Sequence, residues 1–215
     1  MLNSEVIDTI MARLAGRTAA STRTIVVQEL NEKIRQLERG PLKPWFLEKR
    51  ITGTLPLGVD SLELPTDFLE EYEEGSFRIQ LLDGKWTDPL KVDIEKLESE
   101  TDGVNPGPPE GYSLFGDLFY LGPVPDVDYT YKLKYYGRTD AVADNESLVL
   151  NPWLLEFFNF VTLATAYIVA VTHLQSTDMA AKMQQELTVA SDGFFRAVES
   201  RKHVNMDYLL GGSEN

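Results

Sequence analysis

The stretch from Trp153 to Val171, WLLEFFNFVTLATAYIVAV, decides the fold, because it is almost wholly apolar and has the length of a helix. After Glu156 it runs uncharged for 15 residues, whereas a helix needs about 20 apolar residues to cross a bilayer core. It also contains Asn159, Thr162 and Thr165, and no basic flank would orient it in a membrane. We therefore predict a helix buried on all sides in a soluble protein, with no membrane partner.

Three amphipathic segments can cover this helix. Residues 1–39 predict two helices, with apolar faces at Val6, Ile10 and Leu14 in the first and at Val26, Leu30, Ile34 and Leu37 in the second. Ser21 or Thr22 could cap the second helix, and Gly40-Pro41 ends it. Residues 177–200 repeat apolar side chains at helical spacing, at Met179, Met183, Leu187, Ala190, Phe194 and Val198. Asn151-Pro152 provides a cap and a first residue for the apolar helix. A four-helix bundle follows.

The segment between these helical pairs is rich in short β patterns. Asp83-Gly84 separates residues 76–82 from 85–92 and favours a two-residue hairpin turn, as Gly116-Asp117 does further along. Residues 129–136 alternate tyrosine with Lys132 and Lys134. Residues 101–111, TDGVNPGPPEG, predict an irregular loop because of their prolines and glycines. These patterns predict a small antiparallel sheet.

The predicted fold class is α+β, with two N-terminal and two C-terminal helices forming the bundle around an inserted antiparallel β subdomain. Residues 1–40 and 151–200 would form the bundle, and residues 41–150 the β-rich insertion. Residues 201–215 lose the helical periodicity and end after Gly-Gly-Ser, which predicts a flexible, extended C-terminal tail.

The charge is strongly uneven along the chain. The formal net charge is -14, and residues 51–130 alone hold 18 acidic and four basic residues. A field of this sign repels phosphate, so we expect no grip on nucleic acid, although such a region could line a passage for DNA; solubility is the simpler reading. The absence of cysteine excludes disulfides and thiolate chemistry. The N-terminus does not resemble a secretory signal, and we expect an intracellular origin.

We find no constellation of residues typical of catalysis. The two histidines are His173, at the end of the apolar helix, and His203, in the tail, and neither has a metal-type partner at helical spacing. Nucleophile-elbow, metalloprotease, phosphate-loop and dinucleotide motifs are lacking. The sequence therefore predicts a non-enzymatic protein with no catalytic residues, no cofactor and no metal site.

One enzymatic alternative rests on the acidic segment LPTDFLEEYEEG. Its carboxylates are Asp67, Glu70, Glu71, Glu73 and Glu74. A cell-wall glycoside hydrolase would need two of them across a cleft, one with a raised pKa. A short helical turn capped by Thr66 or Asp67, with solvated glutamates, explains the cluster more simply. A second alternative is a carbohydrate-binding module that uses the tyrosine-rich strand, for example Tyr131 and Tyr135.

Three apolar features are candidates for contacts. The connector residues Trp45, Phe46 and Leu47 would either plug the junction between bundle and sheet or anchor a neighbouring subunit. Any face of the apolar helix left uncovered, at Phe157, Phe160 and Ile168, would contact another subunit. The triplet Tyr208-Leu209-Leu210 lies in the polar tail and could order on binding a partner.

The order of segments resembles the head-to-tail adaptor (connector) proteins of tailed phages. The similarity covers about residues 20–200 and rests on Trp45-Phe46-Leu47 after the second helix, on LPTDF, on GPVP followed by YKLKY, and on the Pro152-started apolar helix. Asn151 stands where the family pattern has an aromatic residue.

This resemblance implies a virion structural protein at the head-tail junction, assembled in the host cytoplasm. It implies a ring of copies of the chain, commonly twelve, that docks beneath the portal and carries tail or nozzle proteins. The bundles would surround a channel through which DNA passes, and Tyr208, Leu209 and Leu210 would contact the portal protein.

Overall fold

The computed structural model describes residues 1–14, 19–72, 75–101 and 105–210, without the side chains of residue 101 and of residues 202–210. The fold is α+β, as predicted, and its helices, strands and second set of helices follow one another along the chain. The chain divides into a helical unit, Met1–Phe46 with Thr139–Asn215, and a β unit, Leu47–Arg138. The sequence had placed these boundaries at residues 40 and 151.

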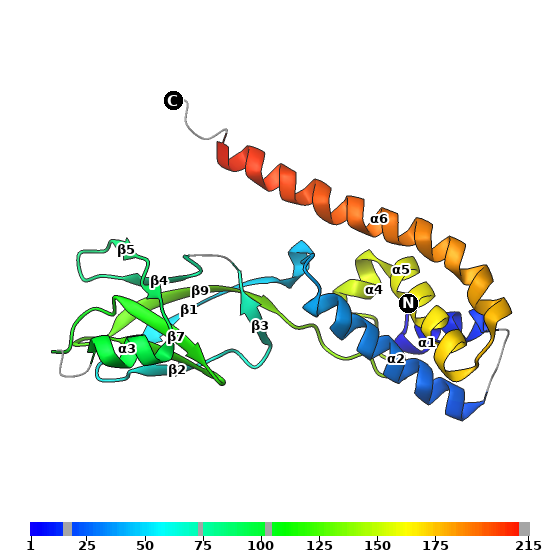
Figure 1. The fold of residues 1–215 in the computed structure, drawn as a ribbon, viewed down its shortest axis with the longest axis horizontal. Coiled ribbons are helices and arrows are strands. Elements are labelled where there is room, and N and C mark those ends of the chain that lie inside the picture. The colour runs from blue at the N-terminus through cyan, green and yellow to red at the C-terminus, as the bar shows by residue number, and fades with distance from the viewer. Residues whose placement is uncertain (15–18, 73–74, 102–104, 211–215) are drawn as a thin grey trace. The chain divides into compact units, whose positions relative to one another are not determined.

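The helical unit contains both terminal parts of the chain (Figure 1). Its elements are α1 (Asn3–Arg13), α2 (Ala20–Arg39), α4 (Pro152–Glu156), α5 (Phe158–Ile168), the π-helical turn η2 (Val169–His173) and α6 (Thr177–Leu210). The predicted inward faces are buried in α1 and α2, except that Leu37 is only partly covered. The apolar stripe of α6 is also buried or partly buried along its length.

The apolar stretch is not one continuous helix. Asn151 caps α4, its side chain accepting a hydrogen bond from the amide of Trp153 at 3.0 Å, and Pro152 follows as predicted. The backbone then leaves helical geometry at Phe157, with φ −127° and ψ 37°, before α5 begins. The prediction of a single helix over 153–171 was therefore wrong, because periodicity does not reveal a local break between two equally apolar segments.

α5 is the centre of the helical unit, since it contacts α1, α2 and α6. Every residue from Phe160 to Ala166 is buried. The two buried threonines satisfy their hydroxyl groups within the helix, Thr162 donating to the carbonyl of Phe158 and Thr165 to that of Val161. Within the described residues, no helix is both long and apolar enough to cross a bilayer.

The β unit contains two sheets rather than the single sheet predicted. The first has the order β1-β9-β4-β5, with β3 also beside β9; its strands are β1 (Glu48–Leu55), β3 (Phe68–Glu71), β4 (Phe77–Gln80), β5 (Trp86–Thr87) and β9 (Tyr129–Gly137). The second has the order β2-β8-β7-β6, from β2 (Ser61–Glu63), β6 (Leu90–Lys91), β7 (Gly111–Phe115) and β8 (Leu118–Gly122). β6 and β7 are parallel and all other pairs are antiparallel.

One core joins the two sheets. Leu55, Phe77 and Tyr129 from the first sheet form a cluster with Tyr112 and Phe119 from the second. The rings of Tyr112 and Phe119 are stacked, with centroids 4.6 Å apart. The helix α3 (Ile94–Thr101) lies against β7 and β8 (Figure 1).

Several predicted boundaries differ from the structure. The turn at Asp83-Gly84 exists, with Gly84 at φ +85°, but β4 ends at Gln80 and β5 holds two residues, so the connection is longer than two residues. The Gly116-Asp117 hairpin has the predicted length. α2 begins at Ala20, with Ala19 rather than Ser21 or Thr22 at the cap. α6 continues to Leu210, although the sequence predicted an extended tail from residue 201.

Candidate functional site

An aromatic cluster holds the end of the N-terminal segment in the helical unit. Phe46 packs edge-on against Trp153, with ring centroids 5.1 Å apart, and Trp45 packs against Phe157 at 5.8 Å. The ring of Phe194, on α6, also contacts the rings of Trp153 and Phe157. These contacts lie within the helical unit of one copy of the chain, and the plug between bundle and sheet stays a prediction. A role of Trp45, Phe46 and the fully buried Leu47 between subunits stays a prediction.

One copy of the chain already covers most of the apolar helix. Phe160 is only 8% exposed and stacks on Phe194. Phe157 and Ile168 are partly exposed, and Val171 is 43% exposed. The apolar side chains that a neighbouring subunit could contact therefore lie toward the two ends of the stretch 153–171. The predicted contact of this stretch with another subunit remains a prediction.

A larger apolar surface lies just before and within α4. Leu148, Leu150 and Leu155 are 65%, 80% and 60% exposed, and we call them the leucine rim. Val149 between the first two is buried, and its amide donates to the carbonyl of Met1 at 3.2 Å. Exposed leucines in this number near one helix start mark a candidate interaction surface. These leucines were not predicted as a contact surface, although the run LVLNPWLL contains the signal.

The proposed portal contact lies at the far end of α6. The backbone of Tyr208, Leu209 and Leu210 forms the last turn of that helix, and their side chains lie outside the described residues. Nearer the middle of the helix, the guanidinium of Arg201 lies 3.6 Å from the ring centroid of Trp45. This cation–π contact ties α6 to the aromatic cluster nine residues before its end.

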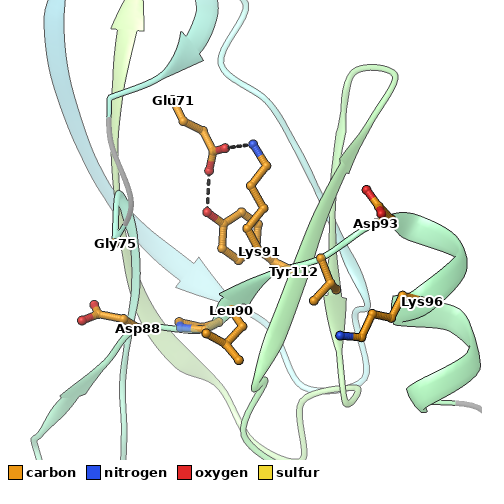
Figure 2. A pocket seen from close by; sticks show the side chains of 10 residues that line it. Glu71, Gly75, Asp88, Leu90, Lys91, Asp93, Lys96 and Tyr112 are labelled. Carbon is orange, nitrogen blue, oxygen red and sulfur yellow. Dashed lines mark hydrogen bonds and ion pairs between the residues drawn. The ribbon is translucent and has the colours of Figure 1, made fainter.

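A hollow in the β unit has a volume of about 980 Å³. Acidic and basic side chains share its wall: Glu71, Asp88, Asp93, Lys91 and Lys96. Figure 2 shows Glu71 at one side of the hollow, pointing toward Lys91 and Tyr112. Here an acid of the predicted hydrolase cluster, Glu71, faces a cavity.

Glu71 is held in a structural network rather than poised for proton transfer. Its carboxylate pairs with Lys91 and accepts hydrogen bonds from the hydroxyls of Tyr112, at 2.6 Å, and Ser76, at 3.2 Å. Glu71 lies on β3 of the first sheet, whereas Lys91 and Tyr112 lie on β6 and β7 of the second. The carboxylate therefore links the two sheets.

Asp67, the other acid of the hydrolase alternative, is also engaged. Burial raises the pKa of its carboxyl group, but hydrogen bonds from Lys49 and from the Tyr135 hydroxyl, at 3.0 Å, together with the charge of Lys49, outweigh burial and leave the pKa below its ordinary value. A general acid needs the opposite shift. Phe68–Glu71 is a strand, so the predicted helical turn was wrong. Glu73 and Glu74 lie outside the described residues. These observations do not support a hydrolase.

The remaining predicted residues occupy structural positions. Tyr129 and Tyr135 are buried, and burial, with the hydrogen bond to an aspartate, raises the pKa of each to about 12. Tyr135 is part of the core cluster between the sheets, and the partly buried Tyr131 packs against that cluster. The two rings therefore do not form an open surface for a glycan. His173 pairs with Glu29 at 2.7 Å, and the side chain of His203 is not described. In the described part of the chain, no three His, Asp or Glu side chains are placed to hold a metal ion.

Comparison with known proteins finds one family. The model of the family described as SU10 adaptor protein matches residues 3–205. The match begins at α1, includes the whole β unit and extends into α6. No curated protein matches the chain.

Proposed function

This chain belongs to the SU10 adaptor protein family, and from that premise we propose that it is a virion structural protein that joins the portal to the tail of a tailed phage. Its partners are the portal protein, tail or nozzle proteins, and further copies of the chain in a ring of commonly twelve. DNA meets the protein only by passing through the ring. The observation that carries the proposal is the family match over nearly the whole chain.

The helical unit supplies the body of the ring in this proposal. Helices α1, α2, α5 and α6 form a four-helix bundle, residues 41–150 are an insertion, and bundles from successive subunits pack side by side around the channel. The contacts of α5 with α1, α2 and α6 support this arrangement. The buried stripe of α6 supports it as well, since it commits one face of that helix to the bundle.

Subunit contacts in the ring involve the apolar surface that a single copy leaves exposed. The leucine rim, together with Val189 and Phe195 on α6, which are 70% and 48% exposed, provides that surface. The partly exposed Phe157 and Ile168 add to it. Burying such side chains between copies stabilises an oligomer by about 25 cal/mol for each Å² of apolar surface removed from water.

The end of α6 contacts the portal in this proposal. Tyr208 adds an aromatic ring with a polar tip, and Leu209 and Leu210 add apolar surface, in the last turn of a helix that continues beyond the aromatic cluster. Aromatic side chains are enriched among the residues that dominate binding energy at protein interfaces.

Native mass spectrometry of the purified chain with the portal protein of the same phage tests the proposal. The expected result is a complex that contains a ring of this chain on the portal. A chain that stays monomeric and leaves the portal unbound would contradict it.

A further inference from the structure

Basic side chains gather on one exposed face of a unit that is acidic overall. Residues 47–138 hold 19 acidic and nine basic side chains. On β9, Tyr131 and Leu133 belong to the core side, so the alternate residues Lys132 and Lys134 point to the outer face. The strand register places Arg50 opposite Lys134 and Arg78 opposite Lys132. We call these four residues, Arg50, Arg78, Lys132 and Lys134, the basic face.

In each of these two cross-strand pairs, two positive charges lie directly opposite each other, and such like-charged pairs destabilise a sheet. Elsewhere in the β unit, lysines have carboxylate partners: Lys49 with Asp67, Lys85 with Asp83, Lys91 with Glu71, and Lys96 with Glu100. On the basic face, Arg78 pairs with Asp88, and Lys132 lies 3.7 Å from the ring centroid of Trp86. Across the described part of the chain, Arg50 and Lys134 form no such ion pair, and both are exposed. They are available to an external anion.

The opposite side of the same unit is acidic. Tyr112 and Leu121 are in the core, so Gly111, which pairs with Gly122, faces outward on the second sheet. A side chain at position 111 would point toward this outer face. The Leu97 side chain of α3 lies 3.2 Å from the position that a Cβ atom on Gly111 would occupy, so α3 covers the outer face of the second sheet there. Leu97 is buried beneath the helix. The exposed side of α3 carries Glu95 and Glu98, which we call the acidic face, whereas Glu100 pairs with Lys96 of the same helix.

We infer that the basic face of one copy binds the acidic face of the next copy around the ring; the inference rests on the proposed function. The two faces lie on opposite sides of one core and are opposite in charge, so each copy can contact one neighbour with each face. Such a head-to-tail contact generates a closed ring when its rotation closes. DNA fits the basic face less well, because the net charge of -10 on residues 47–138 repels phosphate.

Paired charge reversals test this contact. One variant carries Arg50→Glu with Lys134→Glu, and the other carries Glu95→Lys with Glu98→Lys. Each variant alone brings like charges together, so sedimentation velocity should show a ring dissociation constant raised about tenfold or more. Mixed in equal amounts, they should form rings in which the two variants alternate, because every contact then joins opposite charges. Native mass spectrometry gives the ratio of the two chains in each ring.

Lys85→Glu with Arg138→Glu is the matched control, since it makes the same change of charge in the same unit outside the basic face. Circular dichroism of each variant serves to check that it is folded. Rings formed equally well by both variants alone, or no recovery on mixing, would overturn the inference while leaving the adaptor function intact. DNA binding that is lost in Arg50→Glu with Lys134→Glu, with assembly unchanged, would assign the face to DNA and also overturn it. A wild-type chain that neither assembles nor binds portal would remove the proposed function itself.

Discussion

The ring of Phe160 in α5 lies flat against the ring of Phe194 in α6, with centroids 4.8 Å apart and planes that differ by 8°. Phe194 also contacts Trp153 and Phe157, so one side chain joins α6 to both halves of the broken apolar stretch. α6 is the helix whose end we assign to the portal. This aromatic contact, together with the buried Met183 and Val198, therefore attaches α6 to the rest of the helical unit.

Phe194→Ala should lower the free energy of unfolding by about 3 to 5 kcal/mol, because it leaves a cavity at a site that is only 4% exposed. Urea unfolding followed by circular dichroism measures the loss. Phe195→Ala is the matched control, since the neighbouring Phe195 is 48% exposed and should cost less than about 1 kcal/mol. Equal losses in the two variants would show that α6 is not anchored by Phe194.

The ion pair of Asp67 predicts a stability that depends on acid pH. Its folded pKa lies below the unfolded value of about 3.9, so its contribution is present above that value and is lost as the pH falls through the folded pKa. Asp67→Asn should therefore lose less stability than the wild type between pH 5 and pH 2, and Lys49→Met, which removes the partner, should behave similarly. The midpoint of urea unfolding, measured for the wild type and both variants across this pH range, tests this prediction. An unchanged acid dependence in both variants would show that the pair does not stabilise the fold.

Leu150 and Leu82 form a matched pair, because each is 80% exposed in one copy of the chain. Leu150→Asp should weaken ring formation about tenfold or more, since it places a charge in the leucine rim, and should change the free energy of unfolding by less than about 0.5 kcal/mol. Leu82→Asp, between β4 and β5, should leave assembly unchanged. Sedimentation velocity separates the two outcomes, and equal assembly by both variants would exclude the leucine rim from the ring contact.

Replacing Tyr208, Leu209 and Leu210 together with serine should weaken portal binding about tenfold or more while the ring still forms. Surface plasmon resonance on immobilised portal measures the first effect, and native mass spectrometry the second. Glu199→Ser, at an exposed position earlier in α6, is the control and should bind portal normally. Portal binding unaffected by the triple substitution would assign the portal contact to another part of the chain.

The sequence predicted the helices well where one face is apolar and the other polar. The spacing of Val26, Leu30 and Ile34 identified α2, and Asn151-Pro152 identified the start of α4, because caps and amphipathic faces are local properties. The break at Phe157 was hidden because apolar residues continue on both sides of it. The extension of α6 to Leu210 was missed because no apolar stripe marks its last turns.

The candidate site was harder to predict, because it depends on contacts between distant segments. Glu71 was correctly noted as part of an acidic segment, but its link to Tyr112 joins two sheets whose pairing the sequence does not reveal. The basic face likewise depends on the register that places Arg50 opposite Lys134, which are far apart in the chain. The leucines of the rim stand out in the sequence, but the sequence does not reveal that Leu150 is exposed whereas Trp153 is buried.

A cryo-electron microscopy reconstruction of the chain mixed with its portal protein tests the central claim most directly. The account predicts a closed ring of this chain beneath the portal, with helical units packed around a continuous channel and the ends of α6 against portal density. A reconstruction that shows bare portal, or single copies of the chain bound without a ring, would contradict it.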